Sequence, residues 1–176
     1  MWLWRSGVHG VEMLFVTMGT GCTHVSRTSA EDYDVCVGTW GDGRIGTFRG
    51  SRSSMQRYGG QVITADGPVD IGNADGGYEG CPEGLLGAAL GMFKGGPPPV
   101  SAAETLEIYC FMTAAEESKA QAGAAVSLAE TAELAMDEAQ AIVEENWHTP
   151  SMMKSAAEVG WTGANAPIVR ELWGGV

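Results

Sequence analysis

The sequence is poor in positive charge and has no long, unbroken apolar run. Its 176 residues include 10 lysines and arginines against 22 aspartates and glutamates, a formal net charge of −12. Contacts with phosphates or anionic lipids need clustered cations, so this balance argues against a nucleic-acid partner and against a membrane surface. The most apolar stretch, residues 1–18, is interrupted by Arg5, His9 and Glu12. A membrane-spanning helix needs about 20 predominantly apolar residues and a signal peptide needs an unbroken apolar region, so we predict neither.

Cysteine is also scarce and has no recognisable spacing. The four cysteines, Cys22, Cys36, Cys81 and Cys110, form no C-x-x-C pair. Long and irregular spacings are typical of reduced thiols and not of a disulfide framework or a zinc site. We therefore predict a cytoplasmic protein that binds no metal.

Glycine is the abundant residue, at 26 of 176. The glycines follow no triplet period, which excludes collagen and favours many tight turns. The apolar fraction of 44% is typical of a folded globular protein. We predict one domain over residues 1–146, and a tail over residues 147–176 to which the pattern assigns no structure. Because the first expected helix has no cap or lead-in, we also expect the domain to be truncated at its N-terminus.

Residues 22–66 have the period of β-strands. Val35, Val37 and Thr39 alternate with other residues, and Asp42-Gly43 is a strong signal for a hairpin turn. The pattern predicts about four short strands, near residues 23–28, 34–39, 45–49 and 61–65. Strands joined by such short turns form an antiparallel sheet.

Helical periods flank this region on both sides. A short helix is expected to start near Val8 and to stop at Gly19, and a second to follow residue 78 and end by Gly95. Two capping boxes, Ser101–Glu104 and Ser127–Glu130, predict two further helices. The expected fold class is α+β, with an open, mostly antiparallel sheet and helices packed on one face.

The segment Gly41–Gly46 matches the pattern G-x-G-x-x-G. In a dinucleotide-binding loop, a strand leads into the glycines and a helix follows, so that the helix N-terminus faces the pyrophosphate. Here the glycines coincide with the expected hairpin, and a strand follows them. The pattern therefore indicates a β-turn, and we predict no cofactor-binding residue in this chain.

Two histidines lie near other possible metal ligands. His9 and Glu12 are three residues apart on one helix, and Cys22 and His24 follow after one loop. A metal-dependent hydrolase that uses His9, Glu12 and His24 would require these side chains to converge within coordination distance. A local hydrogen bond between His9 and Glu12 is the alternative interpretation.

Arginines gather on the expected hairpin and the segment after it, at Arg44, Arg49, Arg52 and Arg57. Such a patch within an acidic protein could hold an anionic or polyhydroxylated ligand. Ordinary ion pairs with neighbouring carboxylates are the alternative.

Several segments, in order, resemble the C-terminal half of the Gfo/Idh/MocA oxidoreductases, the glucose–fructose oxidoreductase and inositol dehydrogenase family. The resemblance covers roughly residues 7–130 and rests on Gly7–Phe15, Met18-Gly19, Asp34–Trp40, Asp42–Gly50, Phe93–Val100, Glu104–Ile108, Ala114–Ser118 and Val126–Leu128. It implies a two-domain dehydrogenase in which an N-terminal Rossmann domain binds NAD(P) and supplies a catalytic lysine. The C-terminal domain would present an open sheet for substrate contact and oligomerisation.

The resemblance also bears on single residues. The family has a histidine that follows an aspartate in a D-x-x-x-H pattern beside the nicotinamide. His9 falls on that histidine, and Arg5 takes the place of the aspartate. The sequence shows no Rossmann half, and a dehydrogenase cannot transfer hydride without its cofactor. We therefore expect no cofactor bound by this chain alone and no activity without a nucleotide-binding domain.

We predict a substrate-binding and oligomerisation domain of an NAD(P)-dependent sugar or polyol oxidoreductase, forming a homo-oligomer through its sheet face. His9 is the candidate acid/base or substrate-orienting residue. Arg49 and Arg52 are candidates for substrate contact, although the family match assigns them no role. The alternative is a non-catalytic binding or assembly module that dimerises through its sheet. An apolar sheet face would favour assembly, and a concave pocket lined by His9 and the arginines would favour a substrate site.

Overall fold

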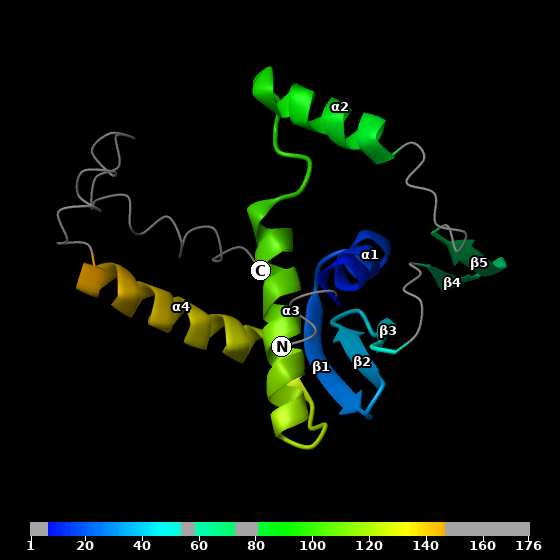
Figure 1. Cartoon of the computed structure of the whole chain (residues 1–176), viewed down its shortest axis with the longest axis vertical. Helices are drawn as coiled ribbons and strands as arrows, with labels where there is room; N and C mark the ends of the chain where they lie inside the picture. The colour runs from blue at the N-terminus through cyan, green and yellow to red at the C-terminus, as the bar shows by residue number, and fades with distance from the viewer. Residues whose placement is uncertain (1–6, 54–58, 73–80, 147–176) are drawn as a thin grey trace.

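The computed structural model describes residues 7–53, 59–72 and 81–146. Its elements are, in chain order, α1 (Val8–Met18), β1 (Cys22–Ser29), β2 (Tyr33–Trp40), β3 (Ile45–Ser51), β4 (Gly60–Thr64), β5 (Gly67–Ile71), α2 (Cys81–Phe93), α3 (Ala102–Ala120), β6 (Val126–Ser127) and α4 (Leu128–Asn146). The predicted α+β class is confirmed, with α1 and α3 packed on the sheet (Figure 1). The expected tail, residues 147–176, and Arg57 lie outside the described residues.

The main sheet has four antiparallel strands in the order β3-β2-β1-β6. The predicted hairpin joins β2 to β3, with Gly43 at φ +91° and the Trp40 N–H donating to the Arg44 carbonyl at 2.9 Å. The segment Gly41–Gly46 is therefore a turn leading into a strand, as the sequence predicts. Strands β4 and β5 form a separate two-stranded sheet.

The four strands predicted within residues 22–66 are confirmed as β1 to β4, and the described residues contain two further strands, β5 and β6, beyond that region. Strand β6 consists of two residues, Val126 and Ser127, which are too few to show an alternation and which overlap the predicted capping box. Strand β5 begins with Gly67-Pro68, and such a pair in the sequence indicates a turn. The local sequence therefore indicates a helix start at β6 and a turn at β5, and it predicts neither strand.

The two faces of the main sheet differ in burial. On β2, Asp34, Cys36 and Trp40 are buried, whereas Tyr33, Val35 and Thr39 alternate with them and are exposed or half-exposed. The buried face packs against α1 and α3, where the Phe15 ring lies 5.7 Å from the rings of both Trp40 and Phe111. This aromatic cluster ties α1, β2 and α3 into one core, and the opposite face stays open.

Helix α1 sits close to the sheet because small residues meet large ones at the contact. A Cβ atom at Gly10 would collide with the Phe48 ring of β3. One at Gly46 would lie 2.9 Å from both Leu14 of α1 and Trp40. The glycines at these two positions therefore set the distance between α1 and β3.

The serines of both predicted capping boxes cap their helices. The Ser101 hydroxyl accepts from the Glu104 N–H at 3.1 Å at the start of α3, and the Ser127 hydroxyl accepts from the Glu130 N–H at 3.3 Å in α4. Side-chain oxygens at these positions satisfy N–H groups that the helix itself leaves without partners. Both helix starts predicted from the sequence are confirmed.

Helices α2 and α4 reach away from the core (Figure 1). Leu128 and Ala132 in the first turns of α4 are buried, whereas Leu134 and Ile142 further along are 72% and 53% exposed. On α2, Leu86, Leu90 and Phe93 are exposed. None of the helices in the described residues has both the length and the apolarity needed to cross a bilayer.

Candidate functional site

An open groove of about 680 Å³ lies between α1, β3 and the β4–β5 hairpin. One wall is the face of α1 that carries Gly10, Met13 and Thr17. The floor is β3 from Ile45 to Arg49, and residues 59–63 of the hairpin form the opposite wall. The groove thus runs along the outer edge of the main sheet, on an apolar base contributed by both α1 and β3.

The polar side chains that line this groove carry positive charge or none. They are Thr17, Arg44, Thr47, Arg49 and Gln61, and no carboxylate is among the described lining residues. A groove with two arginines and no acidic side chain is unusual in a chain of net charge −12. Its chemistry suits a hydroxyl-rich or anionic ligand, since both accept hydrogen bonds from guanidinium groups.

Arg44 is held in place at the groove rim by its own turn. Its Nε donates to Asp42 Oδ2 at 2.7 Å, and its Nη1 donates to the Met18 carbonyl at 2.7 Å. The Arg44 backbone N–H also donates to Asp42, and this bond, followed by the one from the guanidinium, holds the pKa of the Asp42 carboxyl below its usual value. These contacts fix the guanidinium between the turn and the end of α1.

Arg49 is the one of the two predicted substrate-contact arginines that reaches the groove. It lines the groove, and its guanidinium lies 5.0 Å above the ring of Tyr33. A cation over an aromatic face is attracted by the ring quadrupole, which orients the arginine without neutralising it. A role for Arg49 in substrate contact stays a prediction.

Arg52 forms an ion pair, which is the alternative that the sequence left open beside substrate contact. Its guanidinium forms an ion pair with Asp34 and donates to the carbonyls of Ala30 and Glu31, the latter at 2.8 Å. Ala30 and Glu31 belong to the turn between β1 and β2, Asp34 lies at the start of β2, and Arg52 is not among the residues that line the groove. The arrangement gives Arg52 a structural role, tying the end of β3 to that turn.

His9 lies on the exposed surface of α1. Its side chain is 64% exposed, and its Nδ1 lies 3.0 Å from Glu12 Oε2, which is the local pair expected from the sequence. Gly10 next to it lines the groove, but His9 does not. The assignment of His9 as an acid/base residue stays a prediction.

The metal-dependent alternative required three ligands to converge. Within residues 7–53, 59–72 and 81–146, no three histidine, cysteine or acidic side chains come together in a way that could hold a metal ion. His24 lies on β1, opposite Thr39 on one neighbouring strand and Ser127 on the other. The geometry therefore gives the hydrolase interpretation no support.

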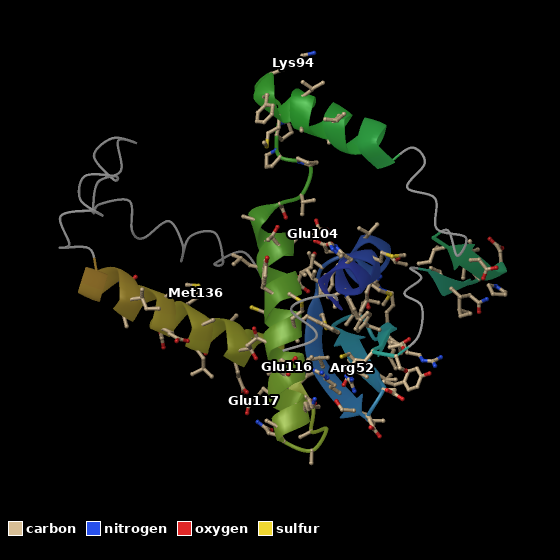
Figure 2. The ribbon with its side chains drawn as sticks, in the orientation of Figure 1. Arg52, Lys94, Glu104, Glu116, Glu117 and Met136 are labelled. Carbon is tan, nitrogen blue, oxygen red and sulfur yellow. The ribbon has the colours of Figure 1, made fainter. Side chains whose placement is uncertain are left out.

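A buried ionic cluster lies at the far end of the sheet, and the sequence analysis missed it. Arg27 Nε lies 3.1 Å from Asp34 Oδ1, and Arg27 Nη1 lies 2.7 Å from Glu116 Oε1 on α3. The Arg27 and Asp34 side chains are 1% and 0% exposed. Arg52 also pairs with Asp34, and Figure 2 shows Glu116 and Arg52 near this end of the sheet. Two arginines thus face two carboxylates, and the cluster is neutral overall.

The pKa values in this cluster favour the charged forms. Burial alone would lower the pKa of Arg27, but the carboxylates of Glu116 and Asp34 more than offset it and raise that pKa. Burial would raise the pKa of Asp34, but hydrogen bonds from Ser29 and Arg27 hold it below its usual value. One feature of the sequence could have indicated this cluster. Arg27 and Asp34 occupy inward positions of their strands, where an apolar residue is expected.

The three cysteines whose side chains the structure describes are free and buried. Burial raises the pKa of Cys22 and Cys36 to about 12 and that of Cys110 to about 11. A thiolate is the nucleophilic form, so these thiols are inert at neutral pH. Glu107 beside Cys22 has a structural use, since its Oε1 accepts from the N–H groups of Gly21 and Cys22, each at 2.7 Å.

Neither a family model, nor a curated protein, nor a solved structure matches this chain. The resemblance to the C-terminal half of the Gfo/Idh/MocA oxidoreductases therefore stays a prediction, carried by the sequence segments alone.

Proposed function

We propose that this chain is an assembly domain that associates with a second copy through the open face of its four-stranded sheet. This is the role that the resemblance implies for the C-terminal half of an NAD(P)-dependent sugar or polyol oxidoreductase. The proposal also applies if the chain is a non-catalytic module. The observation that supports it most is the composition of the open face.

The open face is built from three cross-strand rows. In the order β1, β2, β3 these rows are His24–Thr39–Ile45, Ser26–Val37–Thr47 and Thr28–Val35–Arg49. Tyr33 extends the β2 column, and Tyr33, Val35 and Ile45 are 39%, 36% and 65% exposed. Sheets with one solvated face normally carry polar residues there. Here Tyr33, Val35 and Val37 form an apolar strip along β2, next to Ile45 on β3, and the other row positions are polar. A second sheet packed about 10 Å away would cover this strip.

Light scattering coupled to size-exclusion chromatography tests this proposal directly. We expect the chain to elute as a dimer or tetramer and Val35→Glu to elute as a monomer with an unchanged circular dichroism spectrum. Val35 lies directly opposite Arg49, so the new carboxylate has a cross-strand partner within its own sheet. Val16→Glu is the matched control, because Val16 is 81% exposed on α1. A folded wild-type monomer, or a Val35→Glu variant that stays associated, would reject the proposal.

A small polar ligand in the groove is the second candidate function. The observation that favours it is the lining by Arg44, Thr47, Arg49 and Gln61 without a carboxylate. We propose a sugar or polyol as the ligand class, with Arg49 as a contact residue. Amide shifts of Gly46 and Thr47 during titration with a panel of sugars and polyols would reveal binding, and Arg49→Met should weaken it. The absence of shifts across the panel would leave the assembly role as the function.

The proposal includes a reducing, cytoplasmic location. The support for it is that Cys22, Cys36 and Cys110 are free thiols held inside the core.

A further inference from the structure

Strand β3 ends the main sheet on one side with an open hydrogen-bonding edge. The Trp40 N–H donates to the Arg44 carbonyl and the Gly43 N–H donates to the Trp40 carbonyl, so the backbone groups of Trp40 face β3. Hydrogen-bonded pairs alternate along an antiparallel ladder, so Gly46 and Phe48 bond to β2. The N–H and C=O groups that point outward, away from β2, belong to Ile45, Thr47 and Arg49.

This edge has few of the features that protect a natural sheet edge. Edge strands are usually short, bulged, or interrupted by proline and charge. Strand β3 has seven residues, contains no proline, and pairs with β2 without a register shift. Strand β6 at the other edge has two residues, which is a protected edge by shortness alone. Arg49 is the one charged residue of β3, so length, straight pairing and the lack of proline are the features that leave this edge open.

The β4–β5 hairpin is a sheet of two strands that needs further contacts to be stable. An isolated two-stranded hairpin is marginally stable in water. Thr64 and Gly67 flank its two-residue turn and form a hydrogen-bonded pair, so Val62 and Gly60 also bond to β5. Gln61 and Ile63 therefore point their N–H and C=O groups away from β5, and Ile63 is 75% exposed.

The outer side of β5 carries more edge protection than β3, whose one charged residue is Arg49. Pro68 lies opposite Ile63 and Asp70 lies opposite Gln61, so both are at positions that face away from β4. Proline has no N–H to offer on that side, and in sheets it is confined to edges and strand starts. An added charge at Asp70 further discourages another strand. The outer side of β5 thus has the features of a protected sheet edge. The outer side of β4 instead presents N–H and C=O groups that can pair with another strand.

We propose that β4 docks antiparallel on the outer edge of β3, which gives a six-stranded sheet of order β5-β4-β3-β2-β1-β6. Gln61 and Ile63 are the β4 residues that can form the new ladder, so they pair directly with two of Ile45, Thr47 and Arg49. The hairpin is already beside this edge, because residues 59–63 line the same groove as β3. Strands consecutive in sequence pair in roughly two-thirds of cases, which favours the same arrangement.

Docking has two consequences for the rest of the molecule. It removes the one unprotected edge of the main sheet and adds two strands to the open face. It also fills the groove, so a ligand in the groove and a docked hairpin exclude each other. The inference does not depend on self-association, because both partners belong to one chain.

Amide hydrogen exchange measured by NMR on the whole chain tests the docking. We expect the amides of Thr47 and Arg49 to be protected to within tenfold of the Phe48 amide, which bonds to β2. In Ile63→Pro, one donor facing β3 is lost while the β4–β5 ladder is kept, and Thr47 and Arg49 should become unprotected. Asp70→Pro is the matched control, since it removes a donor on the outer side of β5 and should leave both amides protected.

Two results would overturn the proposal. One is intrinsic exchange at Thr47 and Arg49 in a wild-type chain whose Phe48 amide is protected. The other is protection that survives in Ile63→Pro, which would mean that something other than β4 covers the edge. Protection that rises with protein concentration would identify a second copy as that cover, and this too would reject docking within one chain.

Discussion

Arg27 and Asp34 form a buried ion pair that holds charge inside the core. Taking two charges out of water costs several kcal/mol per ion, and this cost is returned only when their geometry and hydrogen bonds are good. Here Asp34 also accepts from Ser29 and pairs with Arg52, while the Arg27 backbone N–H donates to the Ser118 hydroxyl at 2.8 Å. Removing one member leaves the others buried without compensation.

The first prediction concerns Asp34→Asn. It removes the carboxylate between two arginines, so the free energy of unfolding should fall by about 3–5 kcal/mol. Urea denaturation followed by circular dichroism measures this loss. Asp32→Asn is the matched control, since Asp32 is exposed in the adjacent turn, and its effect should stay within about 0.5 kcal/mol. Equal effects of the two variants would show that the buried pair is not a special contributor to stability.

The second prediction concerns pH. Because the pKa of Asp34 is lower in the folded chain than its ordinary value of 3.8, its contribution is fully present above that value. It is lost as pH falls through the folded pKa, when the carboxylate must take up a proton. Stability against urea should therefore fall between about pH 5 and pH 2, and less steeply in Asp34→Asn than in the wild type. Parallel profiles for the two proteins would contradict this assignment.

At the residue level, the sequence predicts little of the cluster because charge patterns do not show which side chains face inward. Arg52 was a candidate for substrate contact, with ordinary ion pairing as the alternative, and it forms an ion pair with the buried Asp34. The pairing of His9 with Glu12 could be foreseen, since residues three apart on a helix lie on one face.

At the level of elements, the contact between α1 and β3 depends on a glycine in the helix. Gly10 leaves room for the Phe48 ring, and any Cβ atom at that position overlaps it. Glycine inside a helix costs roughly 0.5–1 kcal/mol relative to alanine, so its presence here is explained by the packing.

The third prediction is that Gly10→Ala destabilises the chain by about 1–3 kcal/mol, because the added methyl overpacks the contact. Gly84→Ala is the control, since a Cβ atom there meets nothing within 4 Å on α2. That change should leave the urea midpoint unchanged or raise it. If Gly10→Ala proves as stable as Gly84→Ala, then α1 does not rest on β3 as described.

Helices, strands and turns were easier to predict from the sequence than single side-chain contacts or the groove. Helices α3 and α4 follow from serines and glutamates three residues apart, and the β2–β3 turn follows from Asp42-Gly43, because each is a local signal. Strands β5 and β6 were not predictable from local signals. Gly67-Pro68 at the start of β5 indicates a turn, and β6 is defined only by its pairing with β1.

At the scale of the whole molecule, the glycine pattern at residues 41–46 makes a test of cofactor binding informative. The structure places this segment in a hairpin turn followed by a strand, with no helix N-terminus to face a pyrophosphate.

The fourth prediction is that NADH and NADPH produce no measurable heat of binding in calorimetry with the purified chain. Their phosphates would also meet a protein of net charge −12. Micromolar binding of either nucleotide would contradict it and would require a nucleotide site of another kind. A polyol known to bind in the NMR titration, if one is found, would serve as the positive control.

The fold class and the layer order could be read from the sequence, because the strand period in residues 22–66 and the helical period after residue 78 are distinct. The site could not be read from the sequence, because the groove lies between α1, β3 and the β4–β5 hairpin. No local sequence pattern shows that these three elements lie side by side. Arg49 was named in advance because arginines gather on the expected hairpin and the segment after it, within an acidic chain.

The cluster of Arg27, Asp34, Arg52 and Glu116 also limits which substitutions this chain can accept during evolution. A change at Arg27 or Asp34 leaves an uncompensated charge inside the core, so single substitutions at these two positions should be purged. Replacing the whole set with apolar residues of similar volume would be tolerated, but that route needs several simultaneous changes. Descendants of this chain should therefore keep Arg27 and Asp34 together or lose them together.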